Sequence, residues 1–356
     1  MNDWQEFQHR VDAWSRAGDV ERLRLLDLYQ EAHRYRESDP EHQFDLMTQA
    51  SDEAQRLNEP WWVLFFDAWR LSTLTADMHN FARALPLAME QMVRVARPEN
   101  RQHPMAMTIQ MDVLYTYVQA DPFGYREELE RGFAYLDQQI SREPVSDRFV
   151  FNFRWIEYLR ETMRWQEAYD RAQQHQALVD RGGSQKWWLC WSLFSLCPIC
   201  DALGLVNELA GYAEELVEQS ANESQLTRTR STGWIWRAVV NRTRGKEQAA
   251  AKAFQTGLRL LGNLSSQAEI CADALARYYL LGDDMTAALG IRDRELAAIQ
   301  SKGMNHRNAV LRIERCMLLK RMNRLTLDDL NDARTAIAKM KQPDWYLQRL
   351  ADLGLS

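Results

Sequence analysis

Three cysteines lie close together in the chain: Cys190, Cys197 and Cys200, the last two within a CPIC sequence. Spacings of seven and three residues direct the three thiols toward one side of a helix. A redox pair would need a thioredoxin-like strand and helix around it, and a closed zinc site would need a fourth ligand that the nearby sequence lacks. We therefore expect these thiols to fill a buried helix that Pro198 bends, and we predict no metal site and no cofactor.

A basic stripe is the first candidate binding feature. In the segment RTRSTGWIWRAVVNRTRGK, the side chains of Arg230, Trp234, Arg237, Asn241 and Arg244 recur at helical intervals of four, three, four and three residues. This spacing places all five on one side of a helix. Asparagine can hydrogen-bond a ligand's backbone, and guanidinium groups can bind carboxylates through two parallel bonds.

A second stripe, Asn308, Arg312 and Arg315, has the same character. If both stripes face a groove, they predict a ligand-binding site for a protein or peptide segment, including one with acidic groups or a free carboxylate. The alternative is that the arginines pair with acids of neighbouring helices, such as Glu269 or Asp273. The spacing fits both interpretations.

No catalytic signature accompanies these residues. The sequence contains no GxGxxG, no GxxxxGK followed by Ser or Thr, no HExxH and no GxSxG, and its seven histidines are scattered. A local set of acids, Glu127, Glu128 and Glu130, stands at the start of an expected helix, where carboxylates stabilise the helix dipole. We predict that the protein is not an enzyme.

The elements that must position the stripes are helices. The chain has 356 residues, of which 46% are hydrophobic and 26% charged, so it can bury a core. Only 15 glycines and 9 prolines are present, too few for the closely spaced turns of a β-sandwich or barrel. Composition therefore predicts an all-α fold.

Polar breaks divide the helices into pairs. The second helix of successive pairs is expected to begin near Glu41, Met78, Pro122, Arg164, Leu205, Lys246, Asp283 and Thr326. Capping residues such as Asp39, Asp77 and Thr326 precede these starts. The pattern predicts a right-handed α-solenoid of about eight hairpins in one domain over residues 1–356. Hairpins fill residues 19–342, and capping helices occupy 1–18 and 343–356.

The hairpins resemble tetratricopeptide repeats with longer than usual repeat length. The best match to the family pattern is Trp234 and Ala238 followed by Ala250 and Phe254, although Arg237 and Asn241 depart from the expected Leu and Tyr. Weaker matches are Tyr278 with Ala287 and Ile291, Ala168 with Ala172, and Ala84 with Ala88. The resemblance implies a protein- or peptide-binding scaffold without catalysis; a peptide- or ligand-regulated receptor that controls a second partner is the alternative. HEAT-like solenoids stay open as a subclass.

Charge and hydropathy limit the classes of partner that the protein is expected to bind. Residues 1–150 carry 26 acids and 16 bases, and residues 151–356 carry 24 acids and 28 bases, which together give the net charge of −6. The basic part is too sparse for a dedicated nucleic-acid domain, so nucleic acid is an unlikely partner. The apolar run 187–206 contains Pro198 and Asp201 and is expected to be a buried helix rather than a membrane span. An odd number of cysteines and a polar start predict a cytoplasmic protein. The sequence leaves the oligomeric state unknown.

Overall fold

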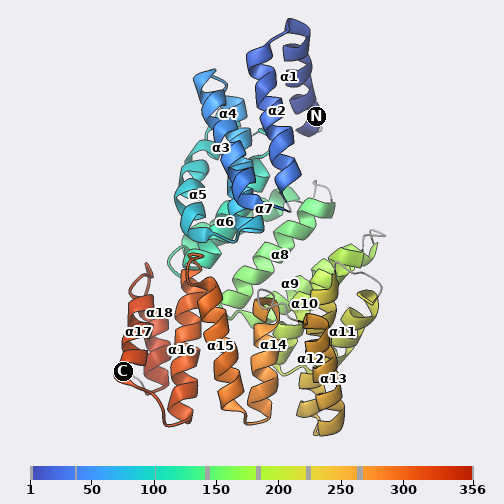
Figure 1. Ribbon diagram of the computed structural model, residues 1–356, viewed down its shortest axis with the longest axis vertical. Helices are drawn as coiled ribbons and strands as arrows, with labels where there is room; N and C mark the ends of the chain where they lie inside the picture. The colour runs from blue at the N-terminus through green and yellow to red at the C-terminus, as the bar shows by residue number, and fades with distance from the viewer. Residues whose placement is uncertain are drawn as a thin grey trace. The chain divides into compact units, whose positions relative to one another are not determined.

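The computed structural model describes residues 3–36, 38–100, 102–140, 145–181, 186–221, 226–262 and 268–354. Within these ranges the protein is built from helices and contains no β-strand (Figure 1). The prediction of an all-α fold is confirmed. Among the described residues, no helix combines the length and the apolar composition needed to cross a bilayer.

The α-helices in chain order are α1 (Asp3–Ala17), α2 (Val20–Tyr35), α3 (Pro40–Arg56), α4 (Pro60–Ser72), α5 (Phe81–Val95), α6 (Ala106–Ala120), α7 (Arg126–Ile140), α8 (Val145–Glu161), α9 (Trp165–Arg181), α10 (Lys186–Leu203), α11 (Val206–Gln219), α12 (Thr227–Thr243), α13 (Glu247–Leu261), α14 (Ala268–Leu281), α15 (Met285–Ile299), α16 (Asn305–Arg321), α17 (Leu327–Ile337) and α18 (Asp344–Asp352). A π-helical turn, η1 (Thr73–Asp77), extends α4, and a 3-10 turn, η2 (Pro98–Asn100), follows α5.

The predicted pairing of helices is confirmed. Eight pairs run from α2 and α3 to α16 and α17, and each second helix begins within four residues of its predicted start. The largest difference is at α7, which begins at Arg126 rather than near Pro122. Asp39 and Thr326 cap their helices as expected, by accepting backbone amide hydrogen bonds. Asp77 does not, because it ends the π-helical turn, and Asn80 caps α5 instead.

Contacts within the chain divide it into two compact units. The N-terminal unit comprises Met1–Ala120, Tyr125–Leu136 and Ser301–Met304, and the C-terminal unit comprises Asp121–Gly124, Asp137–Gln300 and Asn305–Ser356. The assignment of residues 1–356 to one domain therefore stays a prediction.

The N-terminal unit has an aromatic core that α1 covers. Trp62 of α4 is fully buried, and its ring centroid lies 5.1 Å from that of Phe7 and 4.6 Å from that of Trp14, both on α1. Phe65 and Phe66 of α4 are buried beside it. Rings of this size supply much of the apolar area that stabilises a small helical unit.

The C-terminal unit stacks its hairpins in chain order, from α8 and α9 to α16 and α17. The stacking depends on small residues at helix contacts: Ala238 of α12 and Ala250 of α13 are fully buried, as the repeat pattern predicts. At Gly257 the two helices approach so closely that the Ser231 hydroxyl donates a 2.8 Å hydrogen bond to the Gly257 carbonyl. At the end of the stack, Tyr346 of α18 is fully buried in a cluster with Ile313 of α16.

One turn joins the two helices of every hairpin in the C-terminal unit. A residue with left-handed backbone ends each first helix: Met163, Gly204, Gly245, Asp283 and Asn323 have φ between 55° and 70°. The amide that follows donates to a carbonyl five residues earlier, at 2.8 to 3.0 Å. This is the hydrogen bond of the Schellman motif, which ends a helix and fixes the direction of the next segment.

Candidate functional site

The first predicted stripe lies on α12 and faces α11, the second helix of the preceding hairpin. The guanidinium of Arg237 lies 3.7 Å from the carboxylate of Glu214 and 4.6 Å from the ring centroid of Trp234. Arg230 donates from Nη1 to the carbonyl oxygen of Ala221, just beyond the end of α11. Both arginines therefore have partners on the adjacent hairpin.

The end of this stripe is arranged in the same way. Arg244 is exposed, and its Nη2 donates a 2.7 Å hydrogen bond to Oδ1 of Asn207 on α11. Asn241 is half-buried on α12. The helix thus carries one continuous polar side, as the spacing predicts, and that side follows α11.

The second stripe lies on α16 and faces α15 and α17. Arg312 donates from Nε to Oδ1 of Asn308 at 2.9 Å and from Nη1 to Asp332 of α17 at 3.1 Å. Arg315 forms ion pairs with Asp329 of α17 and with Asp293 of α15. These contacts favour the alternative interpretation, in which the arginines pair with neighbouring helices. The acids that pair with the stripes lie on second helices. Of the two acids expected as partners, Asp273 pairs with other arginines, and the side chain of Glu269 lies outside the described residues. A ligand-binding role for the stripes stays a prediction.

The clustered cysteines lie inside α10. Cys190, Cys197 and Cys200 are all fully buried and form no disulfide with a described residue, and Pro198 stands within the same helix. Burial raises the pKa of Cys197 well above its ordinary value and that of Cys200 to about 12. The thiols of Cys197 and Cys200 therefore stay protonated, and all three cysteines fill the core.

A different surface brings charged groups of distant hairpins together. His306 at the start of α16 lies with Nε2 3.1 Å from Oε2 of Glu161 at the end of α8, although the two residues are separated by 145 positions. Arg277 of α14 reaches Asp201 of α10 at 3.0 Å, past the hairpin between them. Because only first helices take part, the row of first helices must curve with these side chains on its concave side.

We call this surface the inner charged face. It comprises Arg160 and Glu161 of α8, Asp201 of α10, Asp273 and Arg277 of α14, and His306 and Arg307 of α16. Three arginines stand against three carboxylates, so the charges of these six side chains cancel. It remains open to solvent, since the side chains of Asp273 and Arg277 keep 39% and 42% of their exposure.

A buried ionic network holds Asp273 in place. Its Oδ1 accepts hydrogen bonds from Arg307 at 2.7 Å and from Arg292 of α15 at 2.8 Å, and both arginines also bind Glu295. Burial opposes ionisation of Asp273, but the charges of Arg307 and Arg292 outweigh burial and hold its pKa well below the ordinary value. Asp273 is therefore a fixed carboxylate that is still accessible from the concave side.

Arg160 is the group of this face whose bonding is incomplete. Its charge acts on Asp273, Glu157 and Glu161, yet its buried Nε has no hydrogen-bond partner among the described residues. A buried donor without a partner is costly. An acceptor from a bound molecule would remove that cost.

The same end of α8 is anchored through Glu161, which contacts His306. Burial would raise the pKa of Glu161, but the hydrogen bond and charge of His306 outweigh it and lower the pKa to about 2. The second ring nitrogen of His306, Nδ1, lies 2.8 Å from the hydroxyl of Tyr346 on α18. The terminal helix thus helps to position the charged face.

Sequence reasoning did not single out Arg160, Glu161, Asp201 or His306. They occur on three helices, α8, α10 and α16, without a common spacing, and only the curvature of the stack brings them together. One signal was available: each lies within the first or last turn of a first helix.

The fold and the face define an array of stacked helical hairpins with a charged concave side. No protein-family model matches the chain, and no curated protein matches it. Among solved structures, it is similar to the apo form of RapI, with 10% identity, coverage of 82% of this chain and 81% of that chain, and a TM-score of 0.46. It is also similar to the apo form of the quorum sensor NprR from B. thuringiensis, with 12% identity, coverage of 84% and 80%, and a TM-score of 0.44.

Proposed function

We propose that this chain is a non-enzymatic helical-repeat protein that binds a protein or peptide segment on the inner charged face of its C-terminal unit. The observation that carries the proposal is the convergence of charged first-helix residues from non-neighbouring hairpins, with Arg160 left incompletely bonded. Stacked hairpins offer extended concave surfaces of this kind to their partners.

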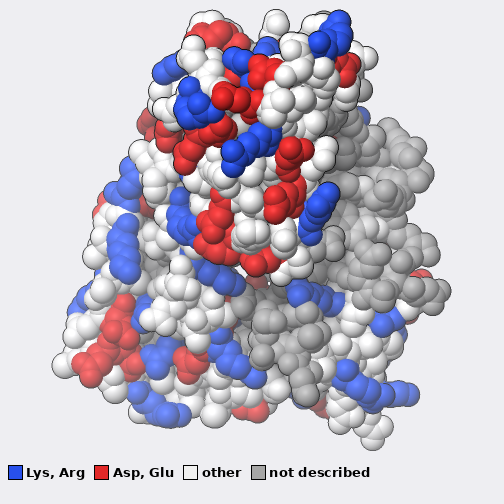
Figure 2. Space-filling view, turned by 45° about the horizontal axis from the view of Figure 1, so that its top comes forward, with Lys and Arg blue, Asp and Glu red and all other residues white. Residues whose placement is uncertain are grey.

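The chemistry of the face suits a polypeptide. Arg160 can bind a carboxylate through two hydrogen bonds, and the fixed carboxylate of Asp273 can accept bonds from backbone amides or a basic side chain. Because the inner charged face has equal numbers of arginines and carboxylates, it has no net attraction for a polyanion. On the side of the molecule drawn in Figure 2, the described acidic and basic side chains are interspersed as well. Nucleic acid therefore stays the less favoured partner.

Arg160→Gln tests the proposal with little risk to the fold, because no hydrogen bond between Arg160 and a described residue is lost. The full-length protein and the variant would be used to select from a peptide library with free C-termini, and to capture proteins from the native host. Arg259→Gln is the matched control, since Arg259 is exposed on the second helix α13. We expect Arg160→Gln to lose the sequences and the protein that the other two proteins retain. Identical selections from all three would refute the site.

The same experiment decides the role of the predicted stripes. In Arg312→Glu with Arg315→Glu, both charges are reversed on α16. Loss of capture with helicity intact would assign these residues to the site. Unchanged capture would show that they only join α15, α16 and α17, as their ion pairs indicate.

A second candidate function is a receptor in which the bound segment controls another partner. It is favoured by the side-chain contacts that join non-neighbouring hairpins, Glu161 to His306 and Asp201 to Arg277, because a charged ligand would compete for them. Loosening these pairs would change the curvature of the stack. X-ray scattering of the protein with a selected peptide would reveal this as altered dimensions; unchanged dimensions would favour the simple scaffold. A cytoplasmic location and the absence of cofactor and metal remain predictions.

A further inference from the structure

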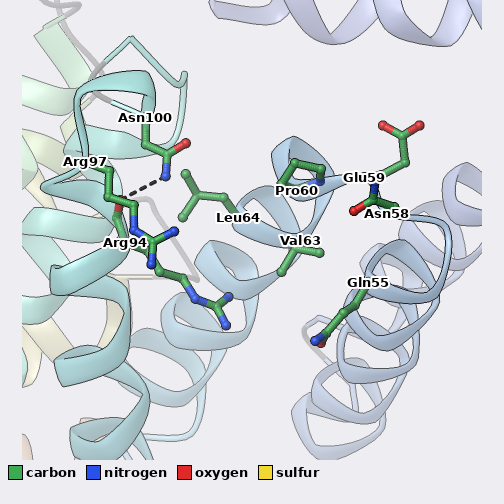
Figure 3. Close-up of a pocket in the computed structure, with 9 residues that line it drawn as sticks. All are labelled: Gln55, Asn58, Glu59, Pro60, Val63, Leu64, Arg94, Arg97 and Asn100. Carbon is green, nitrogen blue, oxygen red and sulfur yellow. Dashed lines mark hydrogen bonds between the residues drawn. The ribbon is translucent and has the colours of Figure 1, made fainter.

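A pocket of about 300 Å³ lies in the N-terminal unit, and none of its lining residues belongs to the inner charged face. Its walls come from the end of α3, the first turns of α4, and the end of α5 with η2 (Figure 3). A volume near the lower limit for small-molecule pockets suits a ligand about the size of one amino-acid residue.

One wall of the pocket is apolar. Pro60, Val63 and Leu64 line it from α4, and Leu64 is only 2% exposed. A branched aliphatic group placed here would leave water at little cost, since the wall is already formed.

The opposite wall is cationic, and one of its two arginines is already neutralised. Arg94 donates from Nη1 to Asp67 at 2.6 Å and from Nη2 to Glu90. Glu59, the one acid of the lining, is neutralised by Arg22 at 2.6 Å.

Arg97 is different, because it forms no ion pair with any described residue. After the paired charges cancel, the pocket therefore keeps one positive charge, that of Arg97. Figure 3 shows the Arg94 and Arg97 side chains extending from the end of α5 into the space that faces α4. The charge calls for a single anionic group on the ligand.

The polar groups around Arg97 are held rigidly. Buried Asp67 also accepts hydrogen bonds from Ser51 and Gln91, which fixes Arg94 between α4 and α5. Asn100 donates from Nδ2 to the carbonyl oxygen of Arg94 at 2.9 Å, and its amide oxygen is directed away from that bond (Figure 3). This oxygen can accept a hydrogen bond from a ligand N–H group.

Helix capping accounts for part of this arrangement. A cation and an asparagine after the end of α5 would stabilise its last carbonyl groups. Capping does not call for an apolar wall across a cavity from the unpaired cation. The combination of the two walls with an amide acceptor indicates recognition of a ligand.

We propose that this pocket binds a carboxylate attached to a branched aliphatic residue, with Arg97 binding the carboxylate and the wall of α4 receiving the side chain. Two sources share this chemistry: a free N-acylated amino acid and the C-terminal residue of a peptide. The proposal concerns the N-terminal unit and is independent of the function proposed for the inner charged face.

Ligand-observed NMR on the full chain tests it with N-acetyl-leucine and with the tripeptide Ala-Ala-Leu, each compared with its C-terminal amide. We expect millimolar binding of at least one free acid and about tenfold weaker binding of its amide, because the amide cannot pair with Arg97. Tighter binding of the tripeptide would identify a peptide C-terminus as the ligand. Tighter binding of N-acetyl-leucine would identify the small molecule.

Variants separate this site from nonspecific binding. Arg97→Gln is expected to weaken binding of the acid about tenfold, whereas Arg131→Gln, which alters an exposed arginine of the same unit outside the pocket, should leave it unchanged. Three results would each overturn the proposal: no binding of either acid, equal binding of acid and amide, or equal binding by the wild type and Arg97→Gln. Circular dichroism of each variant confirms that it is folded.

Discussion

The close approach of α12 and α13 at Gly257 gives a prediction with a built-in control. A methyl group at this position would lie 2.8 Å from Cγ1 of Ile235 and 3.1 Å from the carbonyl oxygen of Ser231. Overpacking of this kind costs about 1 to 3 kcal/mol. At Gly211 of the neighbouring hairpin, on α11, a methyl group would meet nothing within 4 Å.

Both glycines are inside helices, so replacing either by alanine gains about 1 kcal/mol of helix propensity. Gly211→Ala should therefore stabilise the C-terminal unit by about 1 kcal/mol. Gly257→Ala loses that gain to the clash and should be less stable than Gly211→Ala by about 1 to 3 kcal/mol, which is the overpacking cost alone.

Urea unfolding followed by circular dichroism measures the difference, because a shift in midpoint at constant slope reports stability. Both substitutions lie in one compact unit, so they share the same transition. Equal midpoints for the two variants would refute the close helix contact, and with it the repeat register that places Gly257 against α12.

Three further predictions follow from local environments. Met163 occupies a left-handed turn where the next two hairpins have glycine, so Met163→Gly should stabilise by about 1 kcal/mol and Gly245→Met should destabilise by a similar amount, both read from thermal unfolding. Burial lowers the pKa of His103 and His175 to about 4, so their contribution to stability is complete above pH 6.5 and is lost as pH falls toward 4. Each accounts for at most about 3 kcal/mol, and His175→Phe should flatten the decline in unfolding free energy over that range; an unchanged decline would contradict the assignment. All five cysteines are buried, so Ellman's reagent should label none in the native protein and five after unfolding, and rapid labelling of the native protein would contradict their burial.

Helix boundaries could be predicted because their signals are local. Asp39 and Thr326 cap the helices that follow them, and Gly204 and Gly245 supply the left-handed residue that the turns require. Asp77 misled the prediction because a π-helical turn adds residues to the end of α4, and no local residue pattern announces that turn.

The candidate site was harder to predict. Arginine and asparagine at intervals of three and four establish that Arg237 and Arg312 lie on polar sides of their helices, but periodicity cannot tell whether that side meets another helix or a groove. The bond between Glu161 and His306 depends on the summed rotation of every hairpin between them. Small changes in the rotation between hairpins accumulate over such a stack. No local segment of the sequence therefore predicts that Glu161 and His306 come into contact.

The hydrogen bond between Glu161 and His306 also affects where local unfolding of the C-terminal unit should begin. An open row of repeats melts from its ends, where each terminal repeat has only one neighbour. Here the first hairpin is tied to the last through Glu161 and His306, and the last is tied to the closing helix through Tyr346. Because both terminal hairpins then have additional contacts, neither should unfold locally more readily than the others. Amide hydrogen exchange should therefore have similar rates in the outermost and the middle repeats.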